Sequence, residues 1–224
     1  MGAVSAGLDA ALIGRRAALL DLDGTLVDSE PANQAAYRSY FAARGWDVGP
    51  DVLRAFAGRR GAEVFAELDG PWTGEDASAL VDDVVARLDH QSHPPRPVPG
   101  AAELIRRLHA AGIPVALVTS AGRGWAERAV GDVLGVRDLF AAFVTAETTS
   151  AGKPDPAPYL AGAAALGVDP SDAVALEDTV AGVHSALSAG VGLVIGIGTG
   201  APSGLLLDGG AGRVVSGPAE LLRS

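Results

Sequence analysis

The stretch AALLDLDGT, at residues 17–25, decides how this chain is expected to fold. Its first four residues are apolar, which is typical of a short strand that is covered on both faces of a parallel sheet. The strand is predicted to end at Asp21, and Gly24 permits a tight turn that lets the carboxylates of Asp21 and Asp23 approach one centre. The structural alternative is that these residues form an Asx turn and have no functional role. A calcium-binding loop does not fit, because Gly24 stands too early and no Glu occupies the loop's twelfth position.

Two later stretches repeat this arrangement of an apolar strand followed by polar residues. They are VALVTS at residues 115–120 and AVALED at residues 173–178. Further strands are expected at residues 143–144 and 191–197, and helical patterns cover residues 99–112, 156–167 and 180–190. Strands that alternate with helices predict an α/β fold with a doubly wound parallel sheet, which is a Rossmann-like core.

Residues 31–96 break this alternation. They contain helical patterns at residues 35–41 and 77–88 and no clear strand, and the proline-rich run at residues 94–99 predicts a stiff exit. We therefore expect a small α-helical cap domain at residues 31–96. It would be inserted into a core domain made of residues 1–30 and 97–224.

The amino-acid composition argues against several classes of binding partner and of functional site. The chain has 17 basic and 27 acidic side chains and a formal net charge of −10, which argues against nucleic acid and anionic membranes as partners. It has no cysteine, so disulfides and thiolate metal sites are excluded, as is a cysteine nucleophile. No apolar run approaches the roughly 20 residues that span a bilayer, and residues 1–16 lack the charge order of a secretory signal. We expect a cytoplasmic protein that is a monomer, with a dimer as the alternative.

The polar residues at the strand ends are the candidate functional residues. In open α/β sheets, ligands bind beyond the carboxyl ends of the strands, so these residues should converge on one crevice. They are Asp21, Thr119, Ser120, Glu177 and Asp178. One Asp at a strand end is usually a loop or cap residue, but three strand ends with matched chemistry favour a functional site.

Four motifs of the chain resemble those of the haloacid dehalogenase-like superfamily. They are DLDGTLVDS at residues 21–29, VTS at 118–120, GKPDP at 152–156 and LEDTVAG at 176–182. The motifs follow the order found in the family and span most of the chain, and the first and last are specific. The helical insertion lies where the β-phosphoglucomutase-like subfamily carries its small helical cap. The resemblance is closest to the branch of sugar-phosphate and glycerol-phosphate phosphatases.

This resemblance implies a magnesium-dependent phosphatase. Asp21 would be the nucleophile that forms an aspartyl-phosphate, and Asp23 would protonate the leaving group and later activate water. Mg²⁺ would be held by the carboxylates of Asp21 and Asp178 and by the main-chain carbonyl of Asp23. Glu177 would lie in the outer shell and orient a metal-bound water.

The resemblance also implies how a small phosphorylated metabolite would be bound. Lys153 would supply the local cation that an acidic protein needs for a phosphate ester, although a lone lysine between Gly and Pro is otherwise a solvated loop residue. The hydroxyl of Thr119 and the amide of Ser120 would bind phosphate oxygens, with a simple helix cap as the alternative. Arg60, in the Gly-x-Arg pattern of residues 57–61, would select the substrate or else be an exposed loop residue.

Three alternative functions compete with this hypothesis. A phosphomutase of the β-phosphoglucomutase type shares the fold and motifs, but it typically carries an apolar residue at the position of Thr25 and a histidine at that of Asn33. An inactive domain that only binds phosphate esters would not need the full set of reactive side chains. The run GIGTGA at residues 196–201 imitates a dinucleotide-binding motif, but it lies too close to the end of the chain for the βαβ unit that such a site requires.

Overall fold

A computed structural model describes residues 7–222 and confirms the predicted α/β architecture. A six-stranded sheet has the strand order β5-β4-β1-β6-β7-β8, and all of its neighbouring strands are parallel. The strands are β1 (Ala17–Leu20), β4 (Val115–Val118), β5 (Phe140–Val144), β6 (Ala173–Glu177), β7 (Leu193–Ile197) and β8 (Arg213–Val215). Because β1 lies at the centre of this sheet, its residues are buried on both faces, as its apolar sequence predicts.

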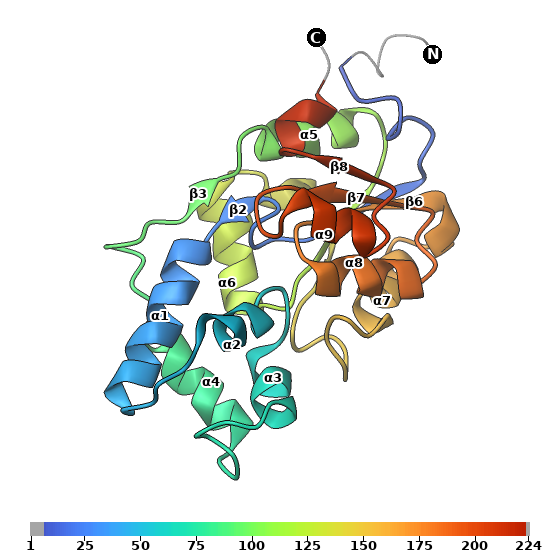
Figure 1. Cartoon of the computed structure of the whole chain (residues 1–224). Coiled ribbons are helices and arrows are strands. Elements are labelled where there is room, and N and C mark those ends of the chain that lie inside the picture. The colour runs from blue at the N-terminus through green and yellow to red at the C-terminus, as the bar shows by residue number, and fades with distance from the viewer. Residues whose placement is uncertain (1–6, 223–224) are drawn as a thin grey trace.

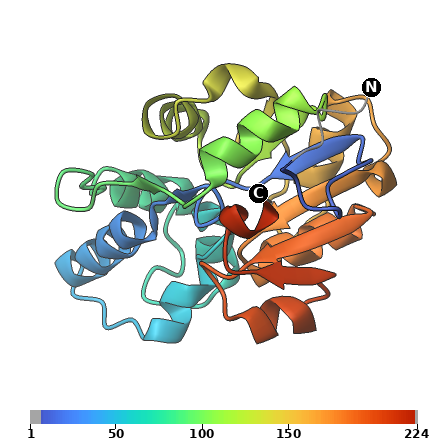
Figure 2. The ribbon, with the colours of Figure 1, turned by 90° about the horizontal axis from the view of Figure 1, so that it is seen from above.

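Helices cover both faces of the sheet. Ala18 and Leu20 of β1 belong to one hydrophobic cluster and Ala17 and Leu19 to another, because successive strand residues point to opposite faces. The first cluster includes residues of α5 (Ala101–Ala110) and α6 (Arg123–Arg128), and the second includes residues of α7 (Ala157–Ala165), α8 (Val180–Ser188) and α9 (Ser203–Asp208). Figure 2 shows the two groups of helices on opposite sides of the strands. The sheet is therefore doubly wound.

The strand register aligns the three stretches singled out in the sequence. Leu20 of β1 lies opposite Leu117 of β4 and Leu176 of β6. The residues that follow these positions therefore emerge at the same edge of the sheet. This edge is where the candidate functional residues gather.

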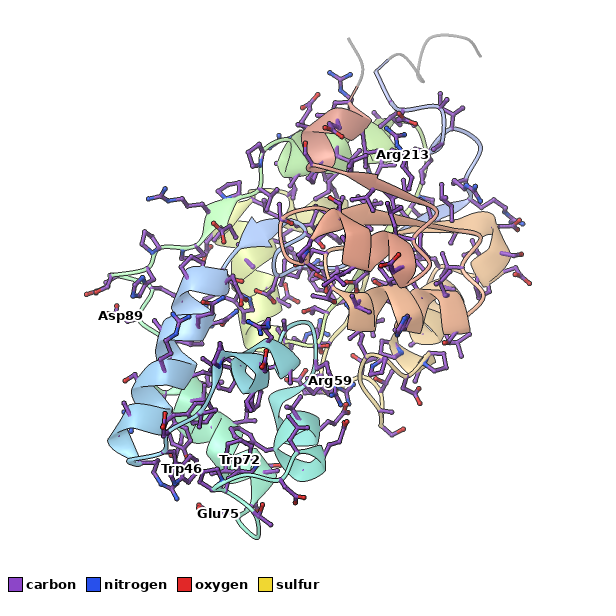
Figure 3. All side chains as sticks on the ribbon, in the orientation of Figure 1. Trp46, Arg59, Trp72, Glu75, Asp89 and Arg213 are labelled. Atoms are coloured by element: carbon purple, nitrogen blue, oxygen red, sulfur yellow. The ribbon has the colours of Figure 1, made fainter. Side chains whose placement is uncertain are left out.

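Between β1 and α5 the chain forms a separate group of helices, here called the four-helix unit. It consists of α1 (Glu30–Ala43), α2 (Pro50–Ala55), α3 (Gly61–Glu67) and α4 (Ala77–Val85), and it packs beside the sheet (Figure 1). It has its own hydrophobic cluster, which includes Phe41, Phe65 and Trp72. Trp72 and Trp46 lie among these helices, away from the sheet (Figure 3).

A two-stranded antiparallel ribbon connects the four-helix unit to the rest of the chain. In it, β2 (Val27–Asp28) pairs with β3 (Arg96–Pro97), with Val27 opposite Pro97 and Asp28 opposite Arg96. The ribbon lies at the two ends of the predicted helical insertion, where the sequence predicted no strand. Strands of two residues are too short to show an alternating pattern, so this ribbon could not be recognised in the sequence.

Several other elements differ from the prediction in their length or were not predicted. α1 begins at Glu30 rather than at residue 35, and β5 begins at Phe140 rather than at residue 143. The short helices α2, α3, α6 and α9 and the edge strand β8 were not predicted. Among residues 7–222, no helix has both the length and the apolar character that crossing a membrane requires.

Candidate active site

Three buried acids meet at the carboxyl edge of the sheet. Asp21 follows β1, Glu177 ends β6 and Asp178 follows it, and one carboxylate oxygen from each lies within 4.8 Å of the others. Asp21 and Asp178 were predicted to meet here as metal ligands. Glu177, which was predicted to lie in the outer shell, belongs to the same group of carboxylates.

Lys153 is the cation of this cluster. Its Nζ donates hydrogen bonds to Asp21 Oδ1 at 2.6 Å, to Glu177 Oε1 at 2.5 Å and to the carbonyl oxygen of Val118 at 2.9 Å. Its side chain is 0% exposed, so the reading of Lys153 as a solvated loop residue is wrong. The other 16 of the 17 basic residues of the chain are arginines. A compact ammonium has three donors that can point to three converging acceptors, whereas a planar guanidinium cannot fill this place.

The cluster contains more acidic than basic side chains. Burial raises the pKa of Asp21 from its ordinary value of 3.8 to about 7, although the Lys153 ammonium acts in the opposite direction. Burial also raises the pKa of Asp178 well above its ordinary value, and the Asp21 carboxylate adds to this effect. One ammonium faces three acids, so these residues fit a divalent cation, which would stabilise the charged forms of Asp21 and Asp178.

Two glycines leave the space that the Asp178 side chain occupies. A Cβ atom at Gly24, where φ is +87°, would lie 2.0 Å from Asp178 Oδ2, and a Cβ atom at Gly200 would lie at the same distance. Thr25 donates a hydrogen bond from Oγ1 to Asp178 Oδ1 at 3.3 Å. The glycine-rich run at residues 196–201 thus allows close packing against Asp178, which gives it a role other than the nucleotide binding that its pattern imitates.

Glu177 is held by protein donors on both of its oxygens. Oε1 accepts from Lys153 and from the Tyr159 hydroxyl at 2.7 Å, and Oε2 accepts from Thr179 Oγ1 at 3.2 Å. A Cβ atom at Gly182 would collide with this carboxylate, so the residue must be glycine. Glu177 therefore orients Lys153. Sequence reasoning missed the part that Tyr159 plays, because only the folded chain brings its hydroxyl to Glu177.

Asp23 lies outside the group of three carboxylates. Its Oδ1 accepts hydrogen bonds from Ser29 Oγ at 2.5 Å and from Trp125 Nε1 at 2.8 Å. Burial raises the pKa of Asp23, and these two hydrogen bonds act in the opposite direction because they favour the ionised form. The contacts with Ser29 and Trp125 were not predicted from the sequence.

Thr119 and Ser120 follow β4 at the same edge. Thr119 is buried, and its Oγ1 accepts a hydrogen bond from the amide of Ala121 at 3.0 Å. This contact closes a turn in the loop after β4 and is not the helix cap offered as an alternative, because α6 begins at Arg123 and no side chain caps it. It leaves the Thr119 hydroxyl proton free to be donated. Ser120 Oγ donates to the carbonyl oxygen of Gly58 at 2.9 Å and so joins the core to the four-helix unit.

The loop of residues 57–61 lies against Thr179, the residue that follows Asp178. Gly58 has φ of +71°, and a Cβ atom there would lie 2.3 Å from Thr179 Oγ1, so only glycine lets this loop approach so closely.

Arg60, in the same loop, does not reach the three carboxylates. Its guanidinium donates to Thr149 at the carbonyl oxygen and at Oγ1, at 3.0 and 2.6 Å. Glu63 accepts a hydrogen bond from the amide of Gly152 at 2.7 Å. Figure 3 shows the neighbouring Arg59 at this boundary between α3 and the core. The predicted contact of Arg60 with a substrate stays a prediction, and it would require the bonds to Thr149 to break.

Known proteins resemble this chain along most of its length. A family model for haloacid dehalogenase-like hydrolases matches residues 15–190, which contain the whole acid cluster and Lys153. Validoxylamine A 7'-phosphate phosphatase from Streptomyces hygroscopicus subsp. limoneus is 37% identical over 180 residues, covering 79% of this chain and 83% of the relative. Hexitol phosphatase A from Escherichia coli (strain K12) is 38% identical over 176 residues, covering 77% and 78%. A solved structure of a candidate β-phosphoglucomutase from Bacteroides vulgatus superposes with a TM-score of 0.80 at 25% identity, covering 93% and 86%.

Proposed function

The chain belongs to the haloacid dehalogenase-like hydrolases, in their sugar-phosphate phosphatase branch, and we propose that it hydrolyses small sugar or polyol phosphate monoesters through an aspartyl-phosphate on Asp21. One observation carries this proposal. A carboxylate at the end of the central strand is fixed by a fully buried ammonium, beside further acids that suit Mg²⁺.

The proposed reaction starts with Asp21. Because Lys153 holds Oδ1, Oδ2 of Asp21 is the oxygen that attacks phosphorus, and the bond from phosphorus to the ester oxygen breaks. Asp23 gives its proton to the leaving alcohol oxygen. Asp23 then takes a proton from the water that attacks the phosphorylated Asp21, which releases phosphate and restores both carboxyl groups. Lys153 offsets negative charge throughout these steps.

A magnesium ion fits the donors that this site offers. The carboxylates of Asp21 and Asp178 and the main-chain carbonyl of Asp23 would hold it, while Glu177 stays bound to Lys153 and Tyr159. When bound, the ion would offset the repulsion between the Asp21 carboxylate and the phosphate group.

We further propose that residues 31–96 act as a cap domain over a core of residues 1–30 and 97–224. Its separate hydrophobic cluster and the narrow β2–β3 ribbon support this division. The contact between Gly58 and Thr179 supports a role of the 57–61 loop in enclosing the substrate. Thr119 and the amide of Ser120 are proposed to bind phosphate oxygens.

The names of the relatives support the class of substrate. One relative is named for validoxylamine A 7'-phosphate and the other for hexitols, and a hexitol is a polyol. The structural similarity to the candidate β-phosphoglucomutase supports a phosphomutase as the second hypothesis for this chain. The hydroxyl of Thr25, bound to Asp178, stands where mutases typically carry an apolar residue, and this favours the phosphatase.

A phosphate-release screen tests the proposal. The wild-type protein with Mg²⁺ is offered p-nitrophenyl phosphate together with a panel of sugar, polyol and nucleotide monophosphates. Free phosphate, with sugar or polyol phosphates preferred, is the expected result. Release from none of them would favour the inactive binding domain. Conversion of glucose 1-phosphate into glucose 6-phosphate without free phosphate would favour the mutase.

Arg60→Ala is expected to change the order of preferred substrates in this screen. The substitution removes a cation from the loop that lies against the site and also removes its hydrogen bonds to Thr149. Arg54→Ala is the matched control, because Arg54 lies in α2 of the same four-helix unit and its side chain is 69% exposed. An unchanged order in the Arg60 variant would remove this residue from the determinants of specificity.

Mg²⁺ is expected to raise the melting temperature of the wild-type protein. An ion that binds only the folded state stabilises it by about 2.7 kcal/mol at a free concentration of 100 times its Kd. The effect should vanish in Asp178→Asn, which loses a proposed ligand, and persist in Asp138→Asn, where the changed residue is exposed. Differential scanning fluorimetry with Mg²⁺ and with EDTA measures both. An equal shift in the two variants would contradict the ligand assignment.

A further inference from the structure

The indole of Trp125 makes a contact with the acid–base residue that the proposed mechanism does not yet explain. Trp125 lies in α6, 102 positions after Asp23, and its Nε1 donates to Asp23 Oδ1 at 2.8 Å. An indole nitrogen is a donor only, so this hydrogen bond has one possible direction. Trp125 lies outside the four motifs on which the family resemblance rests.

The two hydrogen bonds that residues 7–222 make to the Asp23 carboxyl group both end on Oδ1. Ser29 Oγ provides the second, at 2.5 Å. Two donors on one oxygen fix the rotation of the carboxyl group and leave Oδ2 for another partner. Proton transfer needs only one carboxyl oxygen, provided that this oxygen lies within hydrogen-bond reach of the reacting group.

The ring of Trp125 is itself held from two sides. It is half-buried and packs against the main hydrophobic cluster, and the following residue, Ala126, is buried there. The ring of His90 lies with its centroid 4.9 Å from that of Trp125, at an interplanar angle of 50°. His90 belongs to the segment between α4 and β3, so the position of the indole depends on both the core and the exit from the four-helix unit.

We infer that Trp125 is a positioning residue for Asp23, which anchors Oδ1 so that Oδ2 carries the proton to and from the reacting oxygen. The inference rests on the proposed phosphatase function. In the first step, the bond from Asp21 to phosphorus forms, and the ester bond gives its electron pair to the leaving oxygen, which receives the proton of Asp23. Trp125 touches neither substrate nor phosphate; it acts through the orientation of the Asp23 carboxyl group.

The leaving group of the substrate separates this role from a structural one. An alkoxide must be protonated as it leaves, whereas p-nitrophenolate is a stable anion that leaves without help. The ratio kcat/KM covers the steps up to the release of the alcohol, so hydrolysis of the phospho-enzyme does not enter it. Comparing kcat/KM for glycerol 2-phosphate and for p-nitrophenyl phosphate therefore isolates proton donation by Asp23.

Trp125→Phe keeps an aromatic ring against the core and His90, and it removes the N–H donor together with part of the indole ring. We expect it to lower kcat/KM for glycerol 2-phosphate by about tenfold or more and that for p-nitrophenyl phosphate by less than about threefold. Trp46→Phe is the matched control, since it is the same change among the aromatic residues of the four-helix unit, and it should leave both values unchanged. Thermal unfolding of each variant confirms that it is folded under the assay conditions.

Equal losses on the two esters would overturn the inference and show a structural role. No loss on either ester would overturn it as well. A wild-type protein that releases phosphate from neither ester would overturn the proposed function and this inference with it, so the two failures are distinguishable.

Discussion

Asp21→Asn is expected to reduce phosphate release by at least about a thousandfold, because a carboxamide cannot replace a carboxylate as the nucleophile. The fold should remain. The new side chain has nearly the same shape, and the Asp21 amide keeps its hydrogen bond to the carbonyl oxygen of Leu176 at 3.1 Å. The substitution removes an ion pair with Lys153, but it also removes repulsion from Glu177 and Asp178, so the two effects on stability oppose each other.

The assay compares turnover with Mg²⁺ for the wild type, Asp21→Asn and a matched control. Asp28→Asn serves as this control, because Asp28 is an exposed carboxylate in the ribbon that follows the same loop. The control should keep near wild-type activity. Retention of a tenth or more of wild-type turnover by Asp21→Asn would contradict the nucleophile assignment.

Lys153→Met is expected to damage both stability and activity. Removing one partner of a buried ion pair costs about 3 to 5 kcal/mol, since the remaining charges stay buried without compensation. Here Asp21 and Glu177 would both lose their ammonium. The pKa of Asp21, already raised to about 7 by burial, would rise further, so its carboxyl group would be protonated at neutral pH and turnover should fall by at least about a hundredfold.

The stability deficit of Lys153→Met should depend on pH in a defined direction. A carboxyl group whose pKa is higher in the folded than in the unfolded state binds more protons when folded, so stability falls as pH rises through that interval. In the wild type, burial already raises the pKa of Asp21 from 3.8 to about 7, so both proteins lose stability as pH rises through this interval. Only the variant, in which the pKa of Asp21 is higher still, continues to lose stability above about pH 7, and the deficit grows there. Chemical denaturation of the metal-free variant should therefore show a smaller deficit at pH 5 than at pH 8.

Arg16→Met is the matched control for this experiment. Arg16 pairs with Asp172 at 3.4 Å on the surface, where its side chain is 66% exposed, and such pairs contribute at most about 1 kcal/mol. A Lys153→Met protein with wild-type stability and turnover would refute the assigned role of the buried ammonium.

The central part of the fold could be predicted because each of its strands is recognisable from its own short stretch of sequence. The apolar runs of β1, β4 and β6 end at polar residues, and these features identify a parallel sheet and its functional edge. Helices of six or seven residues, such as α2 and α3, show too few turns for a recognisable period. The edge strand β8 has three residues and is fixed by its pairing with β7 rather than by its own sequence.

The site was predictable to the extent that its residues lie in motifs. The meeting of Asp21, Asp178 and Lys153 followed from the strand ends and the family resemblance. Trp125 and Tyr159 contribute through contacts made only in the folded chain, and no local pattern reports such contacts. Without the resemblance, the position of Lys153 between a glycine and a proline would have suggested a solvated loop residue, because nothing in the local sequence reports that the side chain is buried.

The burial of that lysine has a practical consequence for chemical labelling. Because Lys153 is the only lysine of the chain and its side chain is 0% exposed, an amine-directed reagent meets no accessible lysine while the protein is folded. Acylation of Lys153 then requires the site to open. The rate at which a mild acylating reagent modifies Lys153 would measure how often its ammonium separates from Asp21 and Glu177. No residue of the protein needs to be changed for this measurement.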